Sequence, residues 1–172
     1  MSERSLSPAW LASWTERVSG ALAALVGEFE RRHGFPPGTN EVRAACRDDQ
    51  TAARTLAHAD LISADPATLH DSIGDVTWAD VGNGYFLDPA SDVLLRQEHG
   101  AVDAGADLVV AIGSNGGGLS YFAGSDGSVH RARTALLDGP KLDKVADDLR
   151  QFLELLERSL TQFVVDGEPG SL

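Results

Sequence analysis

The chain of 172 residues is 42% hydrophobic and 23% charged, which is ordinary for one soluble globular domain able to bury a core. Its net charge of −12 comes mainly from residues 55–130, which contain eleven acidic residues and one basic residue. A negative field of this kind repels nucleic acid and attracts basic partners. An ordinary solvated surface has the same composition, so the charge also fits a protein that is merely kept in solution by it. No uncharged stretch is apolar enough to cross a membrane, and the opening residues lack the basic-then-apolar order of a secretion signal.

A long amphipathic helix is predicted over residues 8–33. Ser7 is a good cap, Pro8 lies in the first turn, and apolar residues then recur every three or four positions as far as Phe29. Gly34 is expected to end this helix. A tryptophan-bearing stripe of this kind favours core packing over a binding surface.

Shorter elements are predicted in the middle of the chain. A second helical region covers 40–54, and a short helix begins at Asp65. Asn83-Gly84 is a turn signal, so the "YFLD" after it reads as a short strand. A further helical turn is expected over 89–97.

The second half of the chain is predicted to hold three strands and a closing helix. The strands are "DLVVAIGS", "GLSYFAGS" and "SVHRART", joined first by a glycine-rich loop and then by a hairpin at Asp126-Gly127. Apolar residues from Leu142 to Phe163 mark a long helix that ends before Gly167. Hairpin-linked strands with helices at both ends predict an α+β fold with a small, mostly antiparallel sheet.

The glycine-rich loop nearly spells a phosphate-binding loop. Its spacing matches G-x-x-x-x-G-K-[ST], but Leu119 stands where a lysine would neutralise phosphates, and no helix follows whose N-terminus could hold an anion. We therefore predict a structural role for the loop, in which glycine permits positive φ, a bulge or close backbone packing. The residues concerned are Gly113, Asn115, Gly116, Gly117 and Gly118.

Motifs for catalysis and metal binding are not recognisable. The histidines lack metal-binding spacing, and nothing assembles a nucleophile, a base and an orienting group. We expect no enzyme, no cofactor and no metal. The alternative is a small-molecule-binding or enzymatic domain that uses the glycine loop with Ser114, Asp126 or His130.

The segments "AIGSNGGGLSYFAGSDGSVHRART" and "VADDLRQFLELLE" together resemble the SUKH superfamily, the group of the yeast cell-wall assembly regulator and many bacterial relatives. "AIGSNGGGLSYFAGSDGSVHRART" is similar to its strand, its I-G-x-[DN]-G-G-G loop, its aromatic strand and its third strand, and "VADDLRQFLELLE" is similar to its closing helix. The resemblance spans about residues 60–160. "DVGNGYFLDP" also looks like actinobacterial members, and twelve arginines against two lysines suit a GC-rich genome.

The resemblance implies an α+β fold with a mostly antiparallel sheet over a single domain, 1–172, with no catalytic residues and no obligatory cofactor. Many bacterial relatives are immunity proteins that neutralise a toxin, often a nuclease, in the producing cell, and others are regulatory interaction modules. Since the lone Cys46 cannot form an internal disulfide, we expect a cytoplasmic protein-binding domain with a basic partner. The closing helix offers a face for a homodimer.

The predicted partner-binding residues lie in the acidic middle of the chain, where carboxylates would steer a basic partner. Trp78 and Tyr85 are expected as exposed anchors, because Trp and Tyr often dominate interfaces, although Trp78 fits core packing equally well. The full set is Asp71, Asp75, Trp78, Asp80, Asn83, Tyr85, Asp88, Asp103 and Asp107.

Overall fold

The chain folds into helices packed on one antiparallel sheet. The computed structural model describes residues 6–58, 63–99, 102–103, 108–134, 141–168, 170 and 172. For Val102, Asp103 and Leu108 it describes only the backbone. Within these residues there are five helices and eight strands, and the strands pair in the order β1-β2-β3-β5-β6-β7-β8, with β4 joined to β5. Every pairing is antiparallel, so the predicted α+β class is confirmed.

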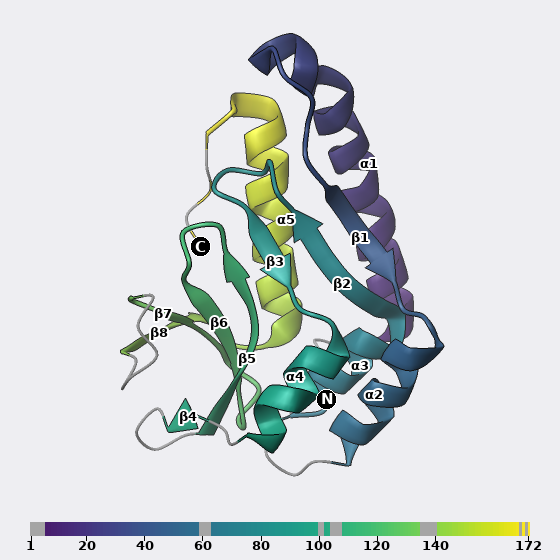
Figure 1. The fold of residues 1–172 in the computed structure, drawn as a ribbon, viewed down its shortest axis with the longest axis vertical. Coiled ribbons are helices and arrows are strands. Elements are labelled where there is room, and N and C mark those ends of the chain that lie inside the picture. The colour runs from purple at the N-terminus through teal and green to yellow at the C-terminus, as the bar shows by residue number, and fades with distance from the viewer. Residues whose placement is uncertain are drawn as a thin grey trace.

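The elements follow this order along the chain: α1 (Pro8–His33), β1 (Asn40–Ala44), α2 (Arg47–Ala57), α3 (Asp65–Ser72), β2 (Ile73–Trp78), β3 (Tyr85–Leu87), α4 (Ala90–Glu98), β4 (Val102–Asp103), β5 (Leu108–Asn115), β6 (Ser120–Gly124), β7 (Val129–Ala132), β8 (Leu142–Ala146) and α5 (Leu149–Asp166). In Figure 1, α1 and α5 lie behind the sheet, and α2, α3 and α4 gather at its lower end.

The two long helices run in the same direction along the back of the sheet (Figure 1). The indole Nε1 of Trp14 on α1 donates to the backbone oxygen of Leu153 on α5 at 2.9 Å. One turn further along both helices, Arg17 pairs with Glu157 at 2.7 Å. The apolar stripe of α5 is therefore buried inside the chain, and the homodimer stays a prediction.

The core between sheet and helices is centred on an aromatic stack. Trp14 lies on Trp78 with ring centroids 6.1 Å apart, and Tyr85 meets Trp78 edge-on at 6.4 Å. Trp78 is 0% exposed and Tyr85 5%, so the prediction of an exposed anchor is wrong for Tyr85, and for Trp78 the core-packing alternative is confirmed. The physical reason is the alternation of β2 and β3, which turns these rings toward α1, where Trp14 offers a flat surface.

The helix predicted over 40–54 is wrong for its first five residues. Asn40–Ala44 forms β1, which pairs with β2, a strand that the sequence patterns did not reveal. The helix α2 begins only after Cys46, whose backbone N–H donates to the carboxylate of Asp49 at 2.8 Å and so caps the first turn. Five residues carry too little periodicity to separate a strand from a helix.

The closing helix also begins later than predicted. Leu142–Ala146 is strand β8, paired with β7, and α5 starts after Asp148, whose carboxylate accepts from Gln151 N at 2.7 Å. The end at Gly167, with φ +70°, is confirmed. The predicted helix 8–33, the short helices after Asp65 and near 90–97, and the strands after 84 are confirmed as well.

Within the described ranges, no helix combines the length and the apolar character needed to cross a membrane.

Candidate functional site

Two of the predicted partner-binding carboxylates hold the edge strand β1 in place. Asp75 on β2 accepts from Arg43 Nε on β1 at 2.6 Å. Asp80 accepts from Gly38 N and from Asn40 Nδ2, both at 2.7 Å, which fixes the chain just where β1 begins. These side chains are therefore already engaged inside the chain.

The other predicted side chains lie apart from these. Asp88 pairs with Arg96 of α4 at 2.5 Å. Asp71, at the end of α3, and Asn83, in the turn after β2, are exposed, and their side chains have no hydrogen bond or ion pair to the described residues. Two predicted side chains lie outside the described ones: Asp103 and Asp107.

Arg43 is the centre of a charged clamp that joins β1, β2 and α2. Its Nη1 and Nη2 donate to the carboxylate of Asp49 at 2.7 and 3.1 Å, while its Nε reaches Asp75. These hydrogen bonds hold the pKa of Asp49 well below its usual range and raise the pKa of Arg43. Gly74 leaves room for the guanidinium, since a Cβ there would lie 2.4 Å from it. The clamp is structural, and Arg43 is not free to bind a partner's carboxylate.

The glycine-rich loop between β5 and β6 uses its amides inside the chain. Gly116 N donates to Gly84 O at 3.1 Å, and the next three amides donate to the side-chain or backbone oxygen of Asn115 at 3.0 to 3.1 Å. A phosphate would therefore find these donors occupied, and a strand rather than a helix follows the loop.

Glycine is required in this loop because two backbones meet there. A Cβ on Gly116 would lie 1.5 Å from the backbone oxygen of Asn83 in the turn between β2 and β3. A Cβ on Gly113 would lie 2.1 Å from the backbone oxygen of Phe86 on β3. The loop therefore packs directly on its neighbouring strand and turn.

Asp126, Ser128 and His130 come together at the hairpin between β6 and β7. The hydroxyl of Ser128 lies 2.5 Å from the Asp126 carboxylate and 2.8 Å from Nε2 of His130. The hydrogen bond from Ser128 lowers the pKa of Asp126. The Ser128 hydroxyl lies between the carboxylate and the imidazole, and the residue is 2% exposed. In a catalytic triad the imidazole lies between the nucleophile and the acid, so this arrangement does not activate the serine. The contact therefore closes the turn, where Ser128 N also donates to Asp126, and Ser114 lies on β5 opposite Phe86 and Ser120.

Among the described side chains, no group of three or more His, Cys, Asp or Glu comes close enough to hold a metal ion. Burial lowers the pKa of His70, so this imidazole is neutral at pH 7. Burial likewise raises the pKa of Tyr121 to about 12, so its hydroxyl keeps its proton. Both residues are 1% exposed, so neither is accessible to a substrate from solvent.

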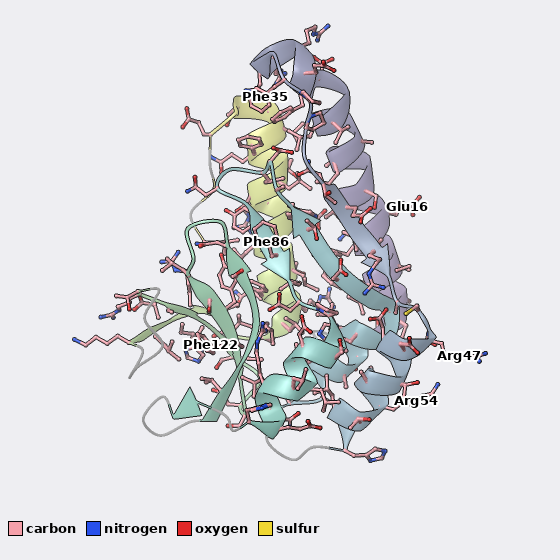
Figure 2. All side chains as sticks on the ribbon, in the orientation of Figure 1. Glu16, Phe35, Arg47, Arg54, Phe86 and Phe122 are labelled. Atoms are coloured by element: carbon pink, nitrogen blue, oxygen red, sulfur yellow. The ribbon has the colours of Figure 1, made fainter. Side chains whose placement is uncertain are left out.

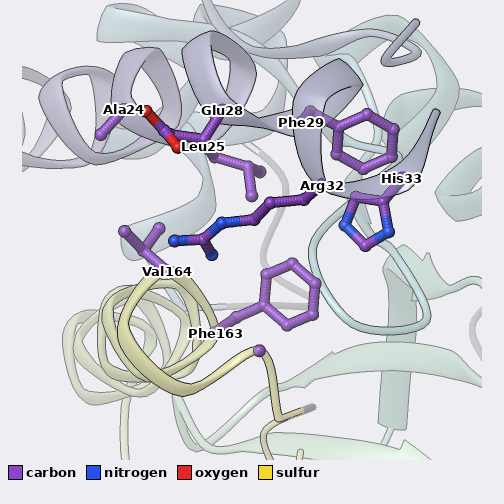
Figure 3. A pocket seen from close by; sticks show the side chains of 9 residues that line it. Ala24, Leu25, Glu28, Phe29, Arg32, His33, Phe163 and Val164 are labelled. Carbon is purple, nitrogen blue, oxygen red and sulfur yellow. The ribbon is translucent and has the colours of Figure 1, made fainter. Parts of the chain in front are cut away.

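An aromatic pocket lies between the C-terminal ends of α1 and α5 (Figure 3). It has a volume of about 190 Å³, with Phe29 and His33 on one side and Phe163 on the other. Figure 3 shows Arg32 extending across it toward Val164. No sequence pattern links these residues, because the two helix ends are distant in the chain.

A larger groove lies between α1 and the edge strand β1. Its volume is about 380 Å³, and small residues of α1 such as Ala12, Thr15 and Ser19 face Val42 and Ala44 of β1 across it. The sequence patterns missed this groove because they assigned residues 40–44 to a helix. Polar residues at alternate positions, as in Glu41 and Arg43, are a strand-like signal, but a segment of five residues is too short for this signal to separate a strand from a helix.

Comparisons with known proteins yield no match to a family model, a curated protein or a solved structure. The function is therefore inferred from the residues and contacts described above.

Proposed function

We propose that this chain is a non-catalytic, cytoplasmic protein-binding domain of the SUKH type, which binds and neutralises a basic partner protein such as a toxin or nuclease. The antiparallel α+β fold agrees with what the resemblance implies. The segment that carries the resemblance forms β5, the glycine loop, β6 and β7, followed by α5. These elements occur in the order that the family pattern has.

The observation that carries this proposal is a set of exposed carboxylates without cations beside them. Most described cations are held in ion pairs by acids of the same chain, as Arg17 and Arg96 are. A chain with a net charge of −12 is left with acids that have no such partner among the described residues. Opposite charge on a partner would be attracted to them and would associate faster. Six of these acids are Glu16, Glu41, Asp48, Asp71, Asp92 and Glu98.

The polar groups suggested for a small-molecule or enzymatic function are engaged inside the chain. The loop amides donate to Asn115 and Gly84, and Ser128 is buried between Asp126 and His130. These contacts support binding of a protein over catalysis at the loop. A regulatory interaction module of the same fold would bind a partner without neutralising it, and experiment separates the two.

The first test is capture of a partner by the tagged, purified chain from a lysate of the cells that produce it. We expect a basic protein that is retained at low salt and released at high salt, since screening weakens attraction between exposed charges. A bait in which Glu16, Glu41, Asp71, Asp92 and Glu98 are replaced by their amides should lose it. Retention of no protein, or of an acidic one that salt does not release, would contradict the proposal.

Neutralisation is tested with the captured protein. Its gene is expressed alone and together with this chain in a host that lacks both. Growth arrest that co-expression relieves is the result expected for an immunity protein. Binding without growth arrest would identify a regulatory module instead.

A further inference from the structure

β1 forms an open edge of the sheet among the described residues, since it pairs only with β2. The backbone oxygen of Thr39 accepts from Ala79 N at 3.0 Å, which sets the alternation of the ladder. With this register, the backbone groups of Glu41 and Arg43 face β2, and the N–H and C=O of Val42 point away from the sheet. An extended chain beside β1 would find these groups ready to pair.

The groove described above lies along this open edge. Figure 1 shows α1 running behind β1 and extending past the edge of the sheet, so the helix forms a wall next to the unpaired strand. The lining contributed by Ala12, Thr15 and Ser19 is small, which leaves space for side chains of an added strand. Alternate side chains of that strand would enter the groove and the others would face solvent.

The charge beside the groove is negative. Glu16 on α1 lines the groove, whereas Glu41 on β1 projects from the strand face opposite to Val42 and Ala44, on the solvent side of an added strand. Both glutamates are exposed and have no ion pair among the described residues, and Figure 2 labels Glu16 on the side of the molecule where β1 lies. Arg43, the cation of β1, is held by two carboxylates. Arg47 begins α2 beyond the end of β1 and does not line the groove. The groove therefore suits a segment with a basic side chain.

A second copy of the chain fits this edge poorly. Paired strands lie about 4.8 Å apart, whereas packed helices need about 8–10 Å between their axes. Because α1 lies beside β1, two β1 strands that paired edge to edge would bring two α1 helices into the same space. A single extended segment has no helix beside it and avoids this overlap.

We propose that the partner protein docks an extended segment with a basic side chain on β1 by strand addition, with alternate side chains in the groove beside α1. This inference rests on the proposed protein-binding function and names the surface and the chemistry of the bound segment. Backbone hydrogen bonds supply affinity at such an edge, and the groove and the two glutamates supply selectivity.

The test uses a display library of random linear ten-residue peptides selected on the purified chain. We expect enrichment of peptides with a basic residue among alternating apolar positions. Two variants should each weaken binding of a synthesised winner by about tenfold in a fluorescence anisotropy titration at low salt. One is Glu16→Gln with Glu41→Gln, and the other is Val42→Pro, which deletes the outward N–H.

Matched controls remove the same charge or the same kind of amide elsewhere. Glu30→Gln with Glu168→Gln changes two exposed acids outside the groove, and Lys144→Pro acts on β8, at the opposite end of the sheet. Both should bind the peptide as the unmodified chain does. Circular dichroism checks each fold, and the glutamine pair decides the matter if Val42→Pro does not fold.

Two results would overturn this inference: no peptide enriched above the level on the Val42→Pro chain, or winners that bind the groove variants and the unmodified chain equally. The lysate capture separates the two proposals. If a basic partner is captured equally well by Val42→Pro and by the glutamine pair, the protein-binding function stands and the docking surface is wrong.

Discussion

Asp49→Asn removes the charge that holds Arg43 between β1 and α2. The Asp49 carboxylate accepts two hydrogen bonds from Arg43, at 2.7 and 3.1 Å, and one from Cys46 N at 2.8 Å. Asparagine has the same shape and keeps one acceptor for the helix cap. Its amide NH₂ is a hydrogen-bond donor and would lie opposite the N–H donors of the guanidinium, so at least one hydrogen bond to Arg43 is lost.

The size of the effect follows from how far water reaches the pair. Asp49 is 7% exposed, but the Arg43 side chain that covers it is 36% exposed. Exposed pairs contribute up to about 1 kcal/mol, and breaking a fully buried pair costs about 3–5 kcal/mol. We expect an intermediate loss of about 2 kcal/mol in the free energy of unfolding, which lowers Tm by roughly 4–8 °C for a chain of this size.

The assay is urea unfolding followed by tryptophan fluorescence, with Asp48→Asn as the control. Asp48 is the exposed neighbour in the same helical turn and has no ion pair among the described residues, so its variant should stay within about 0.5 kcal/mol of the unmodified chain. A loss for Asp49→Asn as small as this would refute the clamp as a source of stability.

The pH dependence has a definite sign. Arg43 lowers the pKa of Asp49 in the folded state below the ordinary value of 3.8. The stabilisation from this carboxylate is therefore fully present above pH 3.8 and is lost as pH falls through the lower folded value. The difference between the unmodified chain and Asp49→Asn should be constant from about pH 7 to 5 and shrink in acid. A difference that stays the same at acid pH would show that the charge is not its cause.

Two further predictions concern packing. Gly116→Ala should destabilise the fold by about 2 kcal/mol or more, because the new Cβ would lie 1.5 Å from the backbone oxygen of Asn83. Gly117→Ala should cost well under about 1 kcal/mol, because the nearest atom to its Cβ is a side-chain atom at 3.3 Å. Equal urea midpoints for the two would contradict the close backbone contact. Trp14→Phe should cost about 2–3 kcal/mol in the same assay, since it loses the bond to Leu153 O and leaves a buried gap, and a loss under about 1 kcal/mol would argue against that bond.

Several parts of the fold were predictable because their signals are local. The helix over 8–33 has its cap, its apolar period and its terminating Gly34 within its own residues, and the structure bears out both ends. The same is true of the hairpin at Asp126-Gly127 and of the strands that flank the glycine loop. Caps, periods and turn residues act over a few positions, so one sequence suffices to read them.

The surface was less predictable than the helices. A carboxylate in the sequence shows charge but not whether a cation lies beside it. Asp75 is engaged by Arg43, 32 residues away, while Asp71 is exposed and has no such partner among the described residues. The acidic middle was therefore visible as a charge surplus, but its division into structural and available acids required the fold.

The helix over 8–33, the end of the closing helix, the turns and the α+β class could be read from the amino-acid pattern, because caps, apolar periods and turn residues act between near neighbours in the chain. The folded structure was needed to show that 40–44 and 142–146 are strands, that Trp78 faces α1, and that a groove lies beside an open edge. Five-residue segments carry too little periodicity to choose between helix and strand. Their choice is made by a distant strand that satisfies their backbone hydrogen bonds and covers one face.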